Sequence, residues 1–171
     1  MKDIEEVIDR LEGADKVFNL LFPGEKLILY LAGGLACLFT DASVRPTMDF
    51  DFIETDFNTK YIRALNILGD YDLVDTSISA IAKDYENRAK VIFSGMGLKV
   101  FSLSAEDIIV MKLNRYSNID KEDIKKLLGV SDKDLLDALL LEATEHLTNP
   151  YSKSMYLENV SKFRKEVLHV Q

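Results

Sequence analysis

The pattern of apolar residues in the first part of the chain predicts a helix, a strand and a second, shorter helix. Positions 4, 7, 8 and 11 are apolar at the spacing of one helix face, and Gly13 predicts the end of that helix. The run 26–31 is almost continuously apolar and predicts a buried strand. Gly33 and Gly34 end this strand, and residues 35–39 predict a short helix.

The middle of the chain alternates between strand-like and helix-like segments. Residues 40–46 are typical of a loop, and residues 48–53 alternate strictly between apolar and polar, which predicts a second strand. Apolar spacing predicts a helix over 61–68 that ends at Gly69, and a further strand over 71–74.

A hairpin and a helical region follow. Residues 91–93 and 98–101 are strand-like and flank Gly95-Met96-Gly97, which is typical of a hairpin. From Ser104 onward the pattern is helical. Helix starts are predicted at two serine–aspartate pairs and at a proline, namely Ser104 with Asp107, Ser131 with Asp134, and Pro150 before a last helix over 152–168.

This order of elements predicts the fold class and the domain organisation. It indicates an α/β (α+β) protein with a mixed β-sheet flanked by helices and a helical C-terminal half. We expect one domain over residues 1–128, with the C-terminal helices of residues 129–171 packed on the same domain. The 171 residues are enough to form a hydrophobic core.

Composition and charge narrow the class of protein. Hydrophobic residues make up 47% and charged residues 29% of the sequence, which is typical of a globular domain, and no apolar run reaches the length of a membrane helix. The acidic N-terminus lacks the basic start and apolar run of a signal peptide, so we expect a cytoplasmic protein with no membrane partner. The net charge of −8 argues against a general nucleic-acid binder, but it is compatible with a local basic patch or with a substrate carried by metal ions.

The segment from Gly33 to Asp51 carries the candidate chemistry. Glycines between a strand and a helix let the backbone approach a ligand closely, and amides at a helix N-terminus favour phosphate. Asp49 and Asp51 are two positions apart on the predicted strand, so their side chains point to one face with Cα atoms about 6.6 Å apart. Two such carboxylates can share one divalent cation or hold a pair of cations, while Phe50 and Phe52 face the core.

Further residues extend this hypothesis. Arg45 and Thr47 come just before the aspartates and can contact phosphates, the arginine through two parallel hydrogen bonds. Ile108, Lys112 and Arg115 share one face of a predicted helix. Two alternatives stay open, because a Gly-Gly pair can be only a turn and acids on an amphipathic strand can simply face solvent.

The combination of these segments resembles the minimal nucleotidyltransferase superfamily, which includes DNA polymerase β. Within it, the chain is most similar to small prokaryotic domains related to components of abortive-infection and toxin–antitoxin systems. The similarity covers residues 27–128 and is carried by two motifs, Gly33-Gly34-x-Ala36 with Arg45-x-Thr47-x-Asp49-x-Asp51, and Leu103 to Leu113 with Asp120, Asp123 and Ile124.

The resemblance implies a nucleotidyltransferase-like mixed sheet in which the Gly33-Gly34 turn holds nucleotide phosphates. It implies that Asp49 and Asp51 bind magnesium (or manganese), and that a helix supplies Lys112 toward the triphosphate. The alternative for this lysine is a stem that lies along the core with its ammonium in water. The implied reaction is transfer of a nucleotidyl group from a nucleoside triphosphate to a hydroxyl on RNA, protein or a small molecule.

Most active members of the superfamily also have a third carboxylate on a neighbouring strand. The strands that we expect beside residues 48–53 are 91–93 and 98–101, which contain no acid, and Glu86 is then the best remaining candidate. We therefore expect transfer that is weak or that depends on a residue outside the usual pattern. A noncatalytic alternative also stays open, in which the chain binds a nucleotide or a cognate protein partner as half of a toxin–antitoxin pair.

Overall fold

The computed structural model describes residues 4–42, 49–53 and 58–167. The elements up to residue 74 are α1 (Ile4–Leu21), β1 (Leu27–Ala32), α2 (Gly33–Ala36), the 3₁₀ turn η1 (Cys37–Phe39), β2 (Phe50–Ile53), η2 (Thr59–Tyr61), α3 (Ile62–Leu65), η3 (Asn66–Leu68) and β3 (Tyr71–Val74). The elements after residue 74 are α4 (Tyr85–Arg88), β4 (Lys90–Ser94), β5 (Leu98–Ser102), α5 (Ala105–Lys112), α6 (Asn118–Leu127), α7 (Lys133–His146) and α8 (Pro150–Glu166).

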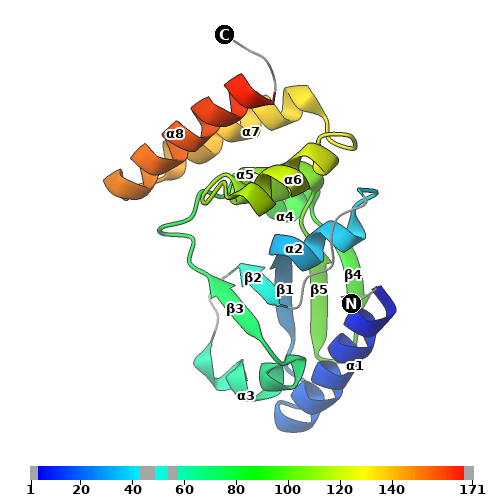
Figure 1. Cartoon of the computed structure of the whole chain (residues 1–171). Helices are drawn as coiled ribbons and strands as arrows, with labels where there is room; N and C mark the ends of the chain where they lie inside the picture. The colour runs from blue at the N-terminus through cyan, green and yellow to red at the C-terminus, as the bar shows by residue number, and fades with distance from the viewer. Residues whose placement is uncertain (1–3, 43–48, 54–57, 168–171) are drawn as a thin grey trace.

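The strands form one mixed sheet in the order β3-β2-β1-β5-β4. β1 pairs antiparallel with β2 and parallel with β5, while β2 and β3 are parallel and β4 and β5 form an antiparallel hairpin. Helices α5 to α8 lie beyond the end of the sheet at which β1 finishes, and α1 and α3 lie toward the opposite end (Figure 1). The structure therefore confirms the predicted α+β class and the helical C-terminal half.

Alternation along the central strands separates a core face from a second face of the sheet. In β1, Leu29 and Leu31 are buried, whereas Ile28 is exposed. Phe50 and Phe52 of β2 are fully buried, as predicted. Because residues alternate between faces, Asp51 must lie on the face opposite the two phenylalanines.

Helix α1 does not end at Gly13, so this prediction was wrong. The helix continues to Leu21 because its buried face continues on both sides of the glycine, through Val7, Leu11, Ala14 and Phe18. A glycine inside a helix costs about 1 kcal/mol relative to alanine, whereas burial of one large apolar side chain contributes about 1.5–3 kcal/mol. Packing therefore outweighs the local signal.

The predicted hairpin is present, but its predicted position in the sheet was wrong. β1 lies between the hairpin and β2, so β2 has β3 as its other neighbour. A hairpin pattern defines the pairing of its own two strands, whereas the strand that it joins is set by contacts distant in sequence. The expectation that 91–93 and 98–101 flank the aspartates fails for this reason.

Helix starts follow the sequence with one exception. The Ser104 side chain accepts a hydrogen bond from the Asp107 amide at 3.1 Å, and Pro150 begins α8. The predicted cap at Ser131 was wrong, because the next residue, Asp132, accepts hydrogen bonds from the first amides of α7. The Ser131 hydroxyl instead donates to the carbonyl of Leu127 in the preceding turn.

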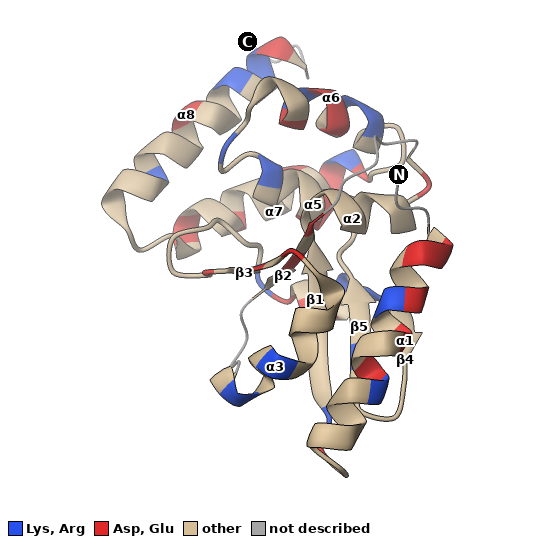
Figure 2. Cartoon of the chain, turned by 60° about the horizontal axis from the view of Figure 1, so that its bottom comes forward, with Lys and Arg blue, Asp and Glu red and all other residues tan. Residues whose placement is uncertain are grey.

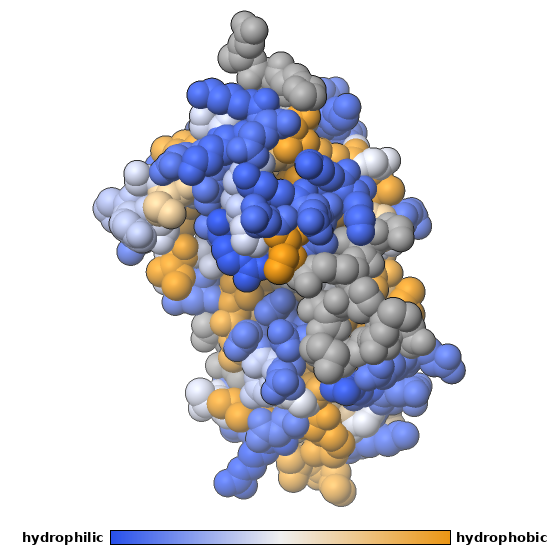
Figure 3. Space-filling model, in the orientation of Figure 1, coloured by the Kyte–Doolittle hydropathy of each residue, from blue (hydrophilic) through white to orange (hydrophobic). Residues whose placement is uncertain are grey.

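The surface is mixed in charge and polarity. Acidic and basic residues alternate along the outer side of α1 (Figure 2). On the face seen in Figure 3, hydrophobic residues form separate patches, one of them at the end of α1 where Leu20 and Leu21 are exposed. No helix in the described part of the chain has the length and apolar character needed to cross a membrane.

Candidate active site

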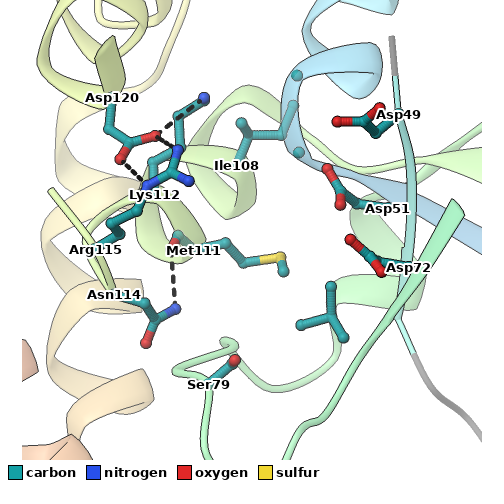
Figure 4. A pocket seen from close by; sticks show the side chains of 13 residues that line it. Asp49, Asp51, Asp72, Ser79, Ile108, Met111, Lys112, Asn114, Arg115 and Asp120 are labelled. Carbon is teal, nitrogen blue, oxygen red and sulfur yellow. Dashed lines mark hydrogen bonds and ion pairs between the residues drawn. The ribbon is translucent and has the colours of Figure 1, made fainter. Parts of the chain in front are cut away.

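A cavity of about 400 Å³ opens between the end of the sheet and helix α5 (Figure 4). Its walls come from the start of α2, from β2 with the residue before it, from β3 with the segment after it, and from α5 with the residues that follow it. The lining residues are Gly33, Gly34, Asp49, Asp51, Asp72, Val74, Ser79, Ile108, Met111, Lys112, Asn114, Arg115 and Asp120. The structure thus brings most of the residues singled out in the sequence to one place.

Three aspartates form one side of this cavity. Asp51 lies opposite Ala32 of β1 and opposite Asp72 of β3, so Asp51 and Asp72 are direct neighbours on one face of the sheet. Asp49 precedes β2 by one residue and also lines the cavity. All three carboxylates point toward the cavity (Figure 4). Adjacent strands are about 4.8 Å apart, so this is a dense cluster of negative charge.

The carboxyl of Asp51 has a strongly shifted pKa. Burial, followed by the charges of Asp72 and Asp49, raises its pKa to about 6 from an ordinary value of 3.8. Lys112 and Arg115 act in the opposite direction without compensating for this. The protein alone therefore stabilises the charged form of this carboxyl poorly.

Gly33 makes room for this carboxylate. Its φ of 63° lies in the left-handed region that favours glycine, and a Cβ at this position would overlap the side chain of Asp51. Two independent constraints, backbone conformation and space, thus select glycine here. The Gly-Gly pair is more than a turn, because it begins α2 and Gly33 allows the backbone to pass directly beside the carboxylate of Asp51.

The wall opposite the aspartates is basic and is held by helix α6. Lys112 Nζ lies 2.7 Å from Asp123 Oδ2 and 3.6 Å from Asp120 Oδ1. Arg115 donates two hydrogen bonds to Asp120, at 2.8 and 2.9 Å. Burial acts to raise the pKa of Asp120, but hydrogen bonds from Arg115 and Ser117 outweigh it and lower this pKa to about 2.

These contacts decide between the two alternatives for the side chain of Lys112. The Lys112 side chain is only 8% exposed and its ammonium is paired with acids, so the alternative with its head in water was wrong. Asp120 forms a capping box with Ser117, the residue that caps the start of α6. Arg115 keeps 71% of its side chain exposed and presents the more accessible cation to the cavity.

Other sequence candidates lie elsewhere. Glu86 belongs to α4 and lines a separate cavity with Tyr85 and His146, and the structure does not bring it to the aspartates. Arg45 and Thr47 lie outside the described residues.

Asp72 was missed in the sequence. Its segment, 71–74, was predicted as a strand, and an acid within a strand beside Asp-x-Asp would have been the signal. The missing information was that this strand, rather than the hairpin, is the neighbour of β2.

The donor set fits a hard divalent cation that keeps part of its own coordination shell. Carboxylate oxygens are the ligands that Mg²⁺ and Mn²⁺ prefer, and Asp49, Asp51 and Asp72 supply them. In the described ranges, no group of three or more acidic, histidine or cysteine side chains lies close enough together to hold a metal ion. Mg²⁺ usually binds through one or two carboxylates together with water and substrate phosphates, which is consistent with this open arrangement.

Comparison with known proteins agrees with this geometry. The model of the family described as "Nucleotidyltransferase of unknown function (DUF6036)" matches residues 9–169, which include the whole cavity and the C-terminal helices. No curated protein and no solved structure matches the chain. The family match confirms the resemblance to nucleotidyltransferases that the motifs indicate. The chain belongs to this family of nucleotidyltransferases of unknown function.

Proposed function

We propose that this protein transfers a nucleoside monophosphate from a nucleoside triphosphate to a hydroxyl acceptor, in a reaction that depends on Mg²⁺ or Mn²⁺. The observation that carries the proposal is the juxtaposition of Asp49, Asp51 and Asp72 on one side of a cavity whose opposite wall presents Arg115 and Lys112. Carboxylates facing cations across a cavity suit a metal-bound polyphosphate, which carries both signs of charge.

The reaction makes one bond and breaks one. The acceptor oxygen attacks the α-phosphorus, the bond from that phosphorus to its bridging oxygen breaks, and pyrophosphate leaves while the hydroxyl proton passes to the carboxylate cluster. A bound divalent cation would neutralise the charge that develops on the phosphate oxygens. Asp51 lies between Asp49 and Asp72 and would be the central carboxylate that holds the cation, and Gly33 leaves space for it.

The basic wall has two separable roles. Arg115 is exposed, and its guanidinium can donate hydrogen bonds to the terminal phosphates in addition to those it gives Asp120. Lys112 is buried and paired, so it holds α5 and α6 together and adds positive potential at the cavity wall. Removal of either should weaken triphosphate binding. Loss of Lys112 takes a cation from both Asp120 and Asp123, whereas loss of Arg115 takes two hydrogen bonds from Asp120 alone.

Asp72 bears directly on the noncatalytic alternative. That alternative depended on the lack of a third carboxylate on the strands expected beside Asp49 and Asp51. With Asp72 in that role, the proposed site has the acids that an active member needs. The expectation of weak catalysis had the same reason, which Asp72 removes, and Glu86 lies in a separate cavity. A cognate protein partner and a toxin–antitoxin context stay hypotheses.

The position of the label in a radioactive substrate tests the proposed reaction. Each of the common nucleoside triphosphates, labelled on the α- or the γ-phosphate, would be incubated with protein, Mg²⁺ or Mn²⁺, and total RNA, a protein extract or small polyols as acceptor. Nucleotidyl transfer labels the acceptor from the α-labelled substrate only and releases pyrophosphate. Labelling from the γ-phosphate, or metal-independent labelling that survives in Asp51→Asn, would contradict the proposal.

A further inference from the structure

The cavity has three parts that differ in chemistry. One part is acidic and one is basic, as described above. The third is formed by uncharged side chains, Val74, Ser79, Met111 and Asn114. Figure 4 shows Ser79 and Asn114 away from both charged groups, with Met111 extending from α5 toward the aspartates. A nucleoside triphosphate is divided in the same way, into a metal-bridged reacting phosphate, terminal phosphates and an uncharged nucleoside.

Asn114 fixes one wall of this uncharged part. Its Oδ1 accepts a hydrogen bond from the Ala80 amide at 2.7 Å, and its Nδ2 donates to the Ala80 carbonyl at 3.1 Å. Nδ2 also donates to the carbonyl of Met111 at 2.9 Å. Both backbone groups of Ala80, which is 1% exposed, are thereby tied to the end of α5. The segment after β3 cannot move away from the cavity without breaking these bonds.

This arrangement leaves Ser79 as a polar group available to a ligand. The Asn114 amide has used both of its N–H donors. The Ser79 hydroxyl is partly exposed, lines the cavity, and has no hydrogen bond to the residues that the structure describes. Val74 and the flexible, polarizable thioether of Met111 provide apolar surface in the same cavity. One hydroxyl beside apolar surface suits a flat heterocycle with hydrogen-bonding edges.

We infer that this uncharged part of the cavity binds the nucleoside of the triphosphate and sets the preference for the base. Val74 and Met111 contact the base or sugar, the Ser79 hydroxyl forms a hydrogen bond to it, and Asn114 is a positioning residue that holds Ser79 in place. A cavity of about 400 Å³ is within the range of small-molecule sites. This inference rests on the proposed function, because it assigns the remaining part of the same substrate.

Inorganic tripolyphosphate separates this inference from the proposed function, since it carries the phosphates without a nucleoside. Calorimetric titration in Mg²⁺ would compare the dissociation constants of ATP, GTP, CTP, UTP and tripolyphosphate for wild type, Ser79→Ala, Met111→Ala and Asn114→Ala. Ser77→Ala is the matched control, because Ser77 is an exposed serine of the same segment that does not line the cavity. Asp72→Asn serves as the reference variant, because it changes the part of the cavity proposed to bind the metal and the phosphates.

We expect Ser79→Ala, Met111→Ala and Asn114→Ala each to weaken binding of the preferred triphosphate about tenfold. The dissociation constants of the four triphosphates should also become more similar to one another. Tripolyphosphate binding should be unchanged in these variants and reduced in Asp72→Asn, and Ser77→Ala should match wild type. If the variants leave triphosphate binding intact, or weaken tripolyphosphate equally, the nucleoside assignment is wrong while the proposed function survives. If wild type binds neither ligand, both proposals fail.

Discussion

Asp51 is the residue at which stability and the proposed chemistry oppose each other most directly. Its carboxyl is partly buried beside Asp49 and Asp72, and its pKa is raised to about 6. Since this pKa lies above the ordinary value of 3.8, the folded state binds the proton more tightly than the unfolded state. The resulting stability is fully present below about pH 4 and is lost as the pH rises through about 6.

Replacement of Asp51 by asparagine should therefore stabilise the protein at neutral pH when no metal is present. We expect Asp51→Asn to raise the free energy of unfolding at pH 8 by on the order of 1–3 kcal/mol and to have little effect at pH 4. Urea unfolding in the presence of a chelator, at several pH values between these limits, measures this. Asp70→Asn is the control, because Asp70 is exposed and does not line the cavity. Equal stability of wild type and Asp51→Asn at pH 8 would show that the carboxyl is not under strain.

The glycine next to Asp51 provides a second test at this scale. Gly33 and Gly24 both have positive φ, at 63° and 81°, but a Cβ would meet Asp51 at Gly33 and open space at Gly24. Gly24→Ala should lose about 1 kcal/mol from backbone strain alone. Gly33→Ala should lose clearly more, and it should also abolish the rise in melting temperature that we expect Mg²⁺ with a triphosphate to cause in the wild type. Similar losses in both variants, with the ligand response kept, would contradict the role given to Gly33.

At the scale of elements, α1 holds the hairpin in place through one carboxylate. Asp15 accepts hydrogen bonds from the amides of Met96, Gly97 and Leu98 at 3.0, 2.8 and 2.7 Å. A Cβ on Gly97 would overlap Phe18 of the same helix, so the glycine permits this close contact. The hairpin glycines were recognised in the sequence as a turn, but the helix that packs on them was expected to end before Asp15.

Loss of the Asp15 carboxylate should destabilise the fold without changing the candidate active site. We expect Asp15→Ala to lower the free energy of unfolding by on the order of 2–4 kcal/mol, because three amides lose their acceptor. Asp9→Ala, an exposed position on the same helix, should change it little. Triphosphate binding by the folded Asp15 variant should equal that of wild type. A melting temperature unchanged by Asp15→Ala would refute this view of the hairpin.

At the scale of the whole molecule, the sequence predicted the individual helices and strands well, but it predicted less well which of them lie side by side. The glycine turn, the Asp-x-Asp strand and the α5 helix were recognisable because each has a local pattern, and the structure gathers them around one cavity. Asp72 was not recognised as a site residue, because its position beside Asp51 depends on the parallel pairing of β2 with β3. The ion pairs of Lys112 depend likewise on how α6 packs against α5. The predicted boundary at residue 128 stays a prediction, although α7 packs on α5 and α8 on α7.

A comparison of Asp72→Asn with Glu86→Gln tests the central claim, which is that Asp49, Asp51 and Asp72 act as one site. The measurement is the rate at which the label of an α-labelled triphosphate passes to RNA, in Mg²⁺ with total RNA as acceptor, with melting temperatures confirming that each variant is folded. We expect Asp72→Asn to lower the wild-type rate on the order of 10²–10³-fold, whereas Glu86→Gln, in a separate cavity, should leave it unchanged. A rate that survives Asp72→Asn but is lost in Glu86→Gln would contradict the central claim.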